Sequence, residues 1–221
     1  MDIKSEIHKY VPPVWRGLLG LSPEKGGPIE PMDLTILFTD IDDFTAITEK
    51  LGDEAAHSLV ATHNRIVRRA LRTNGGNEVK QTGDGIMAYF LSAARAIQCA
   101  IDVQAEVREL RSGPAGAPLR LAMGLNTGAP VFEDGDLYGN AVNRAARITD
   151  AARGDQIVVA EVVRLLAAGK GFAFRPLGPA LLEGQSEPVP LFEVDWSAAV
   201  APTRVADRAD RQVAEANAPS S

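Results

Sequence analysis

The stretch from Leu34 to Thr45 restricts the possible fold more than any other part of the chain. It begins as an apolar, β-branched run and ends in three carboxylates, those of Asp40, Asp42 and Asp43. Such a run is typical of a buried strand. The sequence therefore predicts a strand that delivers acidic side chains to its own end.

A second segment, Asn77 to Phe90, has two short strand-like runs around Gly83-Asp84-Gly85. Glycine allows the chain to turn at positive φ, which leaves Asp84 at the tip of the turn. If the two tips are adjacent, Asp40 and Asp84 can share Mg²⁺ or Mn²⁺, which prefer oxygen ligands. Each segment alone favours a structural interpretation, because Asp-Gly is a common hairpin turn and acids often cap helices.

Composition excludes several classes of protein. The chain has 221 residues, of which 45% are hydrophobic and 24% charged, enough for one core of about 150 residues plus tails. The net charge of −6 gives no sign of a nucleic-acid surface. A single cysteine, no membrane-length apolar run and no signal-peptide core predict a cytoplasmic protein without membrane or nucleic-acid partners.

Three parts of the chain are expected. Residues 1–31 form a lead segment with an apolar patch, Trp15 to Leu21, that is expected to dock within the chain. Residues 32–196 form one catalytic domain, and residues 197–221 lack apolar periodicity and are expected to be a disordered tail. Neither a P-loop nor a Rossmann glycine fingerprint is present.

Within the core, apolar spacing predicts an α+β fold. A helix is expected from Gly52-Asp53 to Gly75-Gly76, carrying His57 and His63 without a second metal ligand at i+4, so a structural role is favoured for both. A second helix follows Ser92, and Leu119 to Leu125 alternates like a half-buried strand. The resulting order is the βαββαβ pattern of a ferredoxin-like sheet. Additional elements follow toward the C-terminus: a helix within Tyr138–Arg153, a strand at Ile157–Val159, a helix at Val162–Ala168, and a strand pair at Phe172–Leu177 and Val189–Val194.

Several motifs, in order and spacing, resemble the catalytic domain of class III nucleotide cyclases. The resemblance covers roughly Asp33 to Val194, and the Ala- and Arg-rich composition is similar to actinobacterial or mycobacterial adenylyl cyclases. The motifs are Phe38-Thr39-Asp40-Ile41 with Phe44-Thr45, Lys80-Gln81-Thr82-Gly83-Asp84, Gly124-Leu125-Asn126-Thr127-Gly128, and Asp136-Leu137-Tyr138-Gly139-Asn140 with Val142-Asn143, Ala146 and Arg147.

The resemblance implies a class III cyclase-like fold and a homodimer that binds ATP at its subunit interfaces. One protomer would hold two divalent cations per site, Mg²⁺ or Mn²⁺, and the other would supply the remaining site residues. Residue by residue, it implies metal ligation by Asp40, Asp84 and the carbonyl of Ile41. It also implies base recognition by Lys80 and Asp136, ribose orientation by Asn143 and phosphate contact by Arg147.

The chemistry of these residue types can be argued independently. Attack of the ribose 3′-hydroxyl on the α-phosphorus suits two cations about 3.5–4 Å apart. The guanidinium of Arg147 suits charge that develops on the phosphoryl oxygens. Adenine presents an acceptor at N1 and a donor at its amino group, which match Lys80 and Asp136, whereas guanine reverses both. The sequence therefore favours ATP over GTP.

Three departures from the family pattern leave alternatives open. Glu183 stands where the family commonly has a phosphate-binding lysine, and Asp43 stands where glycine is frequent. The connection from Gly128 to Asp136 is shorter than the dimerisation arm of many relatives. A non-catalytic, nucleotide-binding regulatory module is the main alternative to an adenylyl cyclase, and a guanylyl cyclase is the less favoured one.

Overall fold

The computed structural model describes residues 32–113 and 116–197. The expected lead segment, and the expected tail beyond Ser197, lie outside these residues. The described elements are β1 (Leu34–Ile41), α3 (Phe44–Leu51), α4 (Asp53–Asn74), β2 (Asn77–Thr82), β3 (Gly85–Phe90), α5 (Ala93–Ser112), β4 (Leu121–Gly128), β5 (Val131–Glu133), β6 (Asp136–Tyr138), α6 (Asn140–Ala151), β7 (Ile157–Ala160), α7 (Glu161–Leu166), β8 (Phe174–Ala180) and β9 (Val189–Val194).

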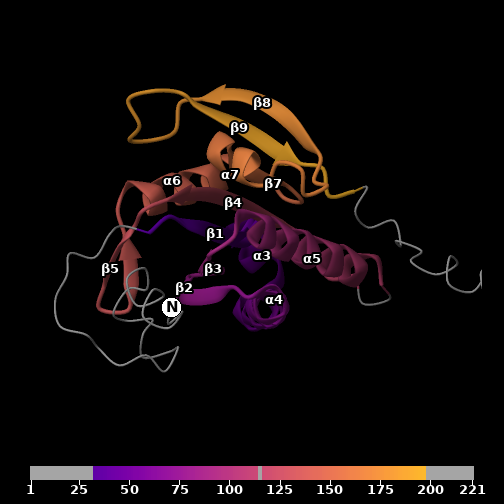
Figure 1. Ribbon diagram of the computed structural model, residues 1–221. Coiled ribbons are helices and arrows are strands. Elements are labelled where there is room, and N and C mark those ends of the chain that lie inside the picture. Colours follow the sequence, from indigo (N-terminus) through magenta and orange to yellow (C-terminus); the bar gives the residue numbers. More distant parts are fainter. Residues whose placement is uncertain (1–31, 114–115, 198–221) are drawn as a thin grey trace, which may run out of the picture.

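Seven strands form one mixed sheet in the order β2-β3-β1-β4-β7-β9-β8, which Figure 1 shows from bottom to top. Each of the first four is antiparallel to its neighbour, and with α4 and α5 they complete the βαββαβ unit. Strand β7 then pairs parallel to β4, and β9 and β8 extend the sheet antiparallel. The prediction of a ferredoxin-like core with additional C-terminal strands is confirmed.

The two faces of the sheet are covered by different helices. Because side chains alternate along a strand, Leu37 and Ile41 of β1 point to one face and pack with α4 and α5 in the main core. Leu34 and Ile36 point to the other face and pack with Val142 and Ala145 of α6. By the same alternation, Asp40 belongs to the α6 face. The expected metal ligand therefore lies on the side of the sheet that carries Asn143 and Arg147.

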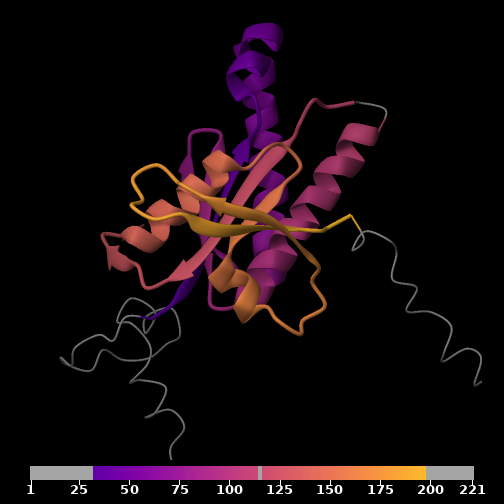
Figure 2. The same ribbon diagram turned by 90° about the horizontal axis from the view of Figure 1, so that it is seen from above.

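One short helix and one small hairpin were not predicted from the sequence. Helix α3 follows β1 directly and has no buried residue, so apolar periodicity gave little signal for it. Figure 2 shows the indigo helical segment projecting beyond the sheet. Strands β5 and β6 form a separate small hairpin after β4. Among the helices of the described residues, none is long and apolar enough to cross a membrane.

Candidate active site

The end of β1 and the β2–β3 turn meet at Asp40 and Asp84. Strand β3 lies beside β1, with Ile86 opposite Thr39, so the turn that precedes Ile86 reaches the last residues of β1. The approach is close enough to require glycine at position 85, because a Cβ atom there would lie 1.9 Å from the Thr39 carbonyl oxygen. The fold therefore brings the two carboxylates together, which meets the condition for a shared cation site.

The pKa of Asp40 reflects its contact with Asp84. Burial, followed by the charge of Asp84 and a hydrogen bond with its side chain, raises the pKa of Asp40 from 3.8 to about 7. The charges of Asp150 and Asp42 act in the same direction. Two carboxylates in contact resist simultaneous ionisation, and a cation placed between them removes that penalty.

Lys80 and Asp136 form an ion pair between β2 and β6. Lys80 is opposite Met87 of β3 and shares its face, which is the α6 face of the sheet. The hydrogen bond from Lys80 holds the pKa of Asp136 below its usual value. The Lys80 ammonium also lies 5.9 Å from the centre of the Tyr138 ring. A cationic donor and an anionic acceptor thus stand side by side.

Helix α6 lies directly against the sheet because of two residues in β4. Gly124 has no side chain to separate the layers, and a Cβ atom there would be 2.3 Å from the Thr149 hydroxyl. Asn126 donates a hydrogen bond of 3.0 Å to the carbonyl of Ala141, which fixes the first turn of the helix. This seating places Asn143, which is exposed, and Arg147, which is half-buried, on the same helix one turn apart.

Arg147 is engaged by two carboxylates. Its Nη1 atom lies 3.0 Å from Asp150 Oδ2 and 3.0 Å from Glu183 Oε2. The Asp150 contact spans three residues of one helix, whereas Glu183 comes from the segment between β8 and β9. The side chain of Glu183 is 77% exposed, so its carboxylate is held only at the surface. In this arrangement the guanidinium is paired with two surface carboxylates.

Comparison with known proteins identifies the family. Residues 29–192 match the family model described as "Adenylate and Guanylate cyclase catalytic domain". The chain belongs to the class III adenylate/guanylate cyclase family.

Curated relatives of this cyclase domain include bacterial and fungal proteins. An uncharacterised protein of Mycobacterium tuberculosis is 32% identical over 158 residues, which cover 71% of this chain and 40% of that protein. The adenylate cyclase of Schizosaccharomyces pombe is 33% identical over 171 residues, covering 66% of this chain and 10% of that enzyme. The chain therefore spans less than half the length of these relatives.

Solved structures show the same fold. The adenylyl cyclase CyaB from P. aeruginosa is 25% identical and superposes with a TM-score of 0.66, covering 75% of this chain and 94% of that one. An adenylate cyclase from Trypanosoma brucei, solved in its monomeric state, is 27% identical with a TM-score of 0.66, covering 80% and 93% of the two chains.

The donor set of this cyclase domain fits a divalent cation, and class III cyclases use divalent metals. Among residues 32–113 and 116–197, no cluster of three or more His, Cys, Asp or Glu side chains is placed to hold a metal. The candidate ligands are therefore a pair of carboxylates, those of Asp40 and Asp84. A pair can be sufficient, because Mg²⁺ is commonly held by one or two carboxylates with waters and substrate phosphates. The raised pKa of Asp40 agrees with a pair that a cation would relieve.

The predicted site side chains fall into three groups: the Asp40–Asp84 pair, the Lys80–Asp136 pair, and Asn143 with Arg147. The side chain of Ile41 is buried in the main core on the other face of the sheet, so only its backbone is available to a site. Sequence reasoning missed the partners of Arg147. The i, i+3 spacing of Asp150 was a readable signal. For Glu183, the family pattern suggested proximity to phosphate, but nothing in the sequence showed that it would pair with Arg147.

Proposed function

We propose that this domain is an adenylyl cyclase, which converts ATP to 3′,5′-cyclic AMP and pyrophosphate. The observation that carries the proposal is the contact between Asp84, in the β2–β3 turn, and Asp40, at the end of β1 on the face that α6 covers. The adenylate cyclases among its relatives support the same conclusion.

Asp40, Asp84 and the backbone carbonyl of Ile41 would hold two divalent cations, Mg²⁺ or Mn²⁺. When bound, such cations favour loss of the proton from the attacking 3′-hydroxyl and stabilise the departing pyrophosphate. The protein's part is to keep both carboxylates ionised and adjacent. Asp40 is exposed at the end of β1, so a cation can reach it, and a bound cation would offset the repulsion from Asp84 that contributes to its raised pKa.

Asn143 and Arg147 would act on the ribose and the phosphates. An amide such as that of Asn143 can donate to and accept from sugar oxygens, which orients the 3′-hydroxyl for in-line attack. The guanidinium of Arg147 would stabilise negative charge on the phosphoryl oxygens. To do so it must leave Glu183 and Asp150, with which it is paired in the free protomer.

Lys80 and Asp136 would select adenine. Their ion pair already places a donor beside an acceptor, and adenine offers the complementary acceptor and donor on its N1 and amino edge. Guanine would set its own donor against Lys80 and its own acceptor against Asp136, which leaves polar groups unpaired. We infer that the nucleotide exchanges the Lys80–Asp136 ion pair for two hydrogen bonds to the base.

We propose further that the active form is a homodimer in which each site combines residues of two protomers. Two inactive variants with defects in different protomers' contributions should then restore activity on mixing. Asp40→Ala mixed with Arg147→Ala is expected to recover up to about a quarter of the unaltered rate, because random exchange leaves one intact site in the mixed dimer. Absence of recovery despite demonstrated subunit exchange would contradict a shared site.

Product formation from ATP and from GTP tests the function. The purified protein, supplied with Mg²⁺ or Mn²⁺, is expected to release cyclic AMP and pyrophosphate from ATP and much less cyclic GMP from GTP. Lys80→Glu should remove most of the preference for ATP. A folded protein that binds ATP and yields no product with either metal would favour the regulatory module, for which the pairing of Arg147 with two carboxylates is the supporting observation.

A further inference from the structure

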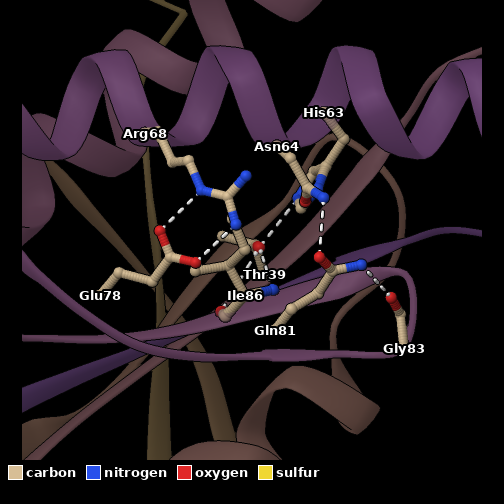
Figure 3. A network of polar contacts seen from close by, with 8 residues as sticks. All are labelled: Thr39, His63, Asn64, Arg68, Glu78, Gln81, Gly83 and Ile86. Carbon is tan, nitrogen blue, oxygen red and sulfur yellow. Dashed lines mark hydrogen bonds and ion pairs between the residues drawn. The ribbon is translucent and has the colours of Figure 1, made fainter.

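Behind the Asp84 turn, a series of polar side chains connects α4, the end of β1 and both sides of the turn (Figure 3). None of them belongs to the groups assigned above to metal, base, ribose or phosphate. Their contacts run from the backbone on one side of Asp84 to the backbone on its other side. We call this set the polar ring: Thr39, His63, Asn64 and Gln81, closed by the Ile86 amide and the Gly83 carbonyl.

The direction of the hydrogen bonds can be worked out from the Gly83 end. The Gly83 carbonyl only accepts, so Gln81 must donate its Nε2 amide to it, at 2.8 Å. The Gln81 Oε1 atom then faces Asn64, whose Nδ2 donates at 3.0 Å. The Asn64 Oδ1 atom is left facing His63 Nδ1 at 3.0 Å, so Nδ1 carries the proton.

The other end is compatible with the same direction. The Ile86 amide only donates, and it donates to the Thr39 hydroxyl oxygen at 3.1 Å. The hydroxyl has two possible acceptors, the Ile86 carbonyl at 3.5 Å and His63 Nε2 at 2.9 Å. Donation over the shorter distance to Nε2 requires that nitrogen to be unprotonated. The Gly83 end therefore places the proton on Nδ1, and a hydrogen bond from the Thr39 hydroxyl to Nε2 suits the neutral ring. Burial lowers the pKa of His63, which agrees with this state.

The turn depends on these bonds because packing supports it poorly from that side. A cavity of about 530 Å³ lies between α3, α4 and the turn, and its lining includes Phe44, Asn64, Gln81 and Gly83. Gln81 itself is exposed, whereas His63 is fully buried. The Gln81–Asn64 link thus extends from a rigid buried group across the rim of an open cavity to the turn.

We propose that the polar ring positions the Asp84 turn against Asp40 and thereby sets the affinity of the two carboxylates for divalent cations. The inference rests on the proposed role of this pair as cation ligands. Thr39 directly precedes Asp40, and Gly83 directly precedes Asp84, so one set of bonds fixes the backbone beside both. Outer-shell groups of this kind typically change metal affinity by about 10-fold or more when removed.

A second link between the same two elements supplies the control. Arg68 lies about one helical turn beyond Asn64 and donates two hydrogen bonds of 2.7 Å to Glu78 of β2. It therefore ties α4 to the same strand as Gln81 does, but at the end away from the turn. A general stabilising role for such links would make Arg68→Met and Gln81→Met equivalent. A positioning role makes only the second variant affect the carboxylate pair.

Two readouts without turnover test the inference. Mn²⁺ binding is measured by electron paramagnetic resonance, and exchange of the Ile86 amide is measured by nuclear magnetic resonance in the metal-free protein. Gln81→Met, at an exposed position that should not prevent folding, is expected to weaken Mn²⁺ binding about 10-fold. It should also speed amide exchange about fivefold, the equivalent of one hydrogen bond. Thr39→Val should weaken Mn²⁺ binding and speed Ile86 exchange by more than Gln81→Met does. Thr39→Ser should keep both near their unaltered values, and Arg68→Met should change neither the affinity nor the exchange rate.

Several outcomes would overturn the inference. One is a Gln81→Met variant with unchanged Mn²⁺ affinity and unchanged Ile86 amide exchange. Another is an Arg68→Met variant whose Mn²⁺ affinity falls as much as that of Gln81→Met. A third is a nitrogen spectrum of His63 that shows the proton on Nε2. Failure of the proposed function is distinguishable from these. If the unaltered protein makes no cyclic nucleotide while the variants change Mn²⁺ binding as stated, the ring is supported and the activity is not. If the unaltered protein binds no Mn²⁺, the claim about cation affinity is overturned, and amide exchange tests only whether the ring positions the turn.

Discussion

The seating of α6 on the sheet gives the sharpest structural prediction, which concerns Gly124→Ala. The added Cβ atom would lie 2.3 Å from the Thr149 hydroxyl, 2.4 Å from the Thr149 amide nitrogen and 2.8 Å from the Ala145 carbonyl. Two of these atoms are backbone, so no side-chain rotation relieves the overlap. Ordinary contact requires the helix to withdraw by roughly 1 Å.

Such a withdrawal should cost about 1–3 kcal/mol of the free energy of unfolding. Because α6 carries Asn143 and Arg147, the withdrawal of the helix should also displace both side chains by a similar distance. A displacement of about 1 Å in a catalytic group typically lowers the rate about 10²-fold. Urea unfolding and initial rates of cyclic AMP formation measure the two effects.

The matched control is Gly128→Ala in the same strand. Its Cβ atom would meet only the Cβ atom of Ala141 on the same helix, at 3.0 Å, so a shift of a few tenths of an ångström suffices. Its losses should therefore be much smaller in both assays. A Gly124→Ala variant that folds and retains the unaltered rate would refute the claim that this contact positions the site residues of α6.

Three further predictions follow from charge and backbone geometry. Glu183→Gln frees Arg147 from one of its two carboxylates, so the rate of product formation should rise. The free energy of unfolding should fall by less than about 1 kcal/mol, the range of exposed ion pairs. Equal effects in the exposed control Glu187→Gln would argue against this. Asp43→Gly should raise the urea midpoint by the equivalent of about 0.5–1 kcal/mol, because Asp43 has a left-handed backbone (φ 56°) that glycine adopts without strain; a lower midpoint would contradict it. The pKa of Asp40 is about 7 in the folded protein and 3.8 in the unfolded chain. The free energy of unfolding of the metal-free protein should therefore fall as the pH rises from about 4 to about 7. Asp40→Asn should remove that fall, worth about 1–2 kcal/mol after solvent screening, and an unchanged pH dependence would contradict the assignment.

Much of the fold could be predicted because its signals are local. The β1 run, the glycine-flanked Asp84 turn and the helical stripe of α4 each show a periodicity or turn chemistry that tertiary packing did not override. The resulting βαββαβ order is nearly sufficient to fix the strand order of the first four strands. Helix α3 was missed because it buries no residue and so lacks the stripe that periodicity detects.

The candidate site was less predictable wherever it depends on contacts between distant segments. The sequence placed Asp40 and Asp84 at the ends of strand-like runs but left their adjacency open. The pairing of Arg147 with Glu183 depends on how the β8–β9 segment lies against α6. His63 occupied an apolar position of its helix, which indicated burial but not its partners. The polar ring joins Thr39, His63 and Gln81 through three separate elements, and no spacing along the chain encodes that meeting.

The central claim is that the Asp40–Asp84 pair holds the cations that drive cyclisation of ATP. The most direct measurement is the rate of cyclic AMP formation, titrated with Mg²⁺ and with Mn²⁺, for the unaltered protein, Asp84→Ala and the exposed control Asp33→Ala. The account predicts metal-dependent activity that Asp84→Ala abolishes at every metal concentration and Asp33→Ala preserves. Activity that survives in a correctly folded Asp84→Ala protein would contradict it.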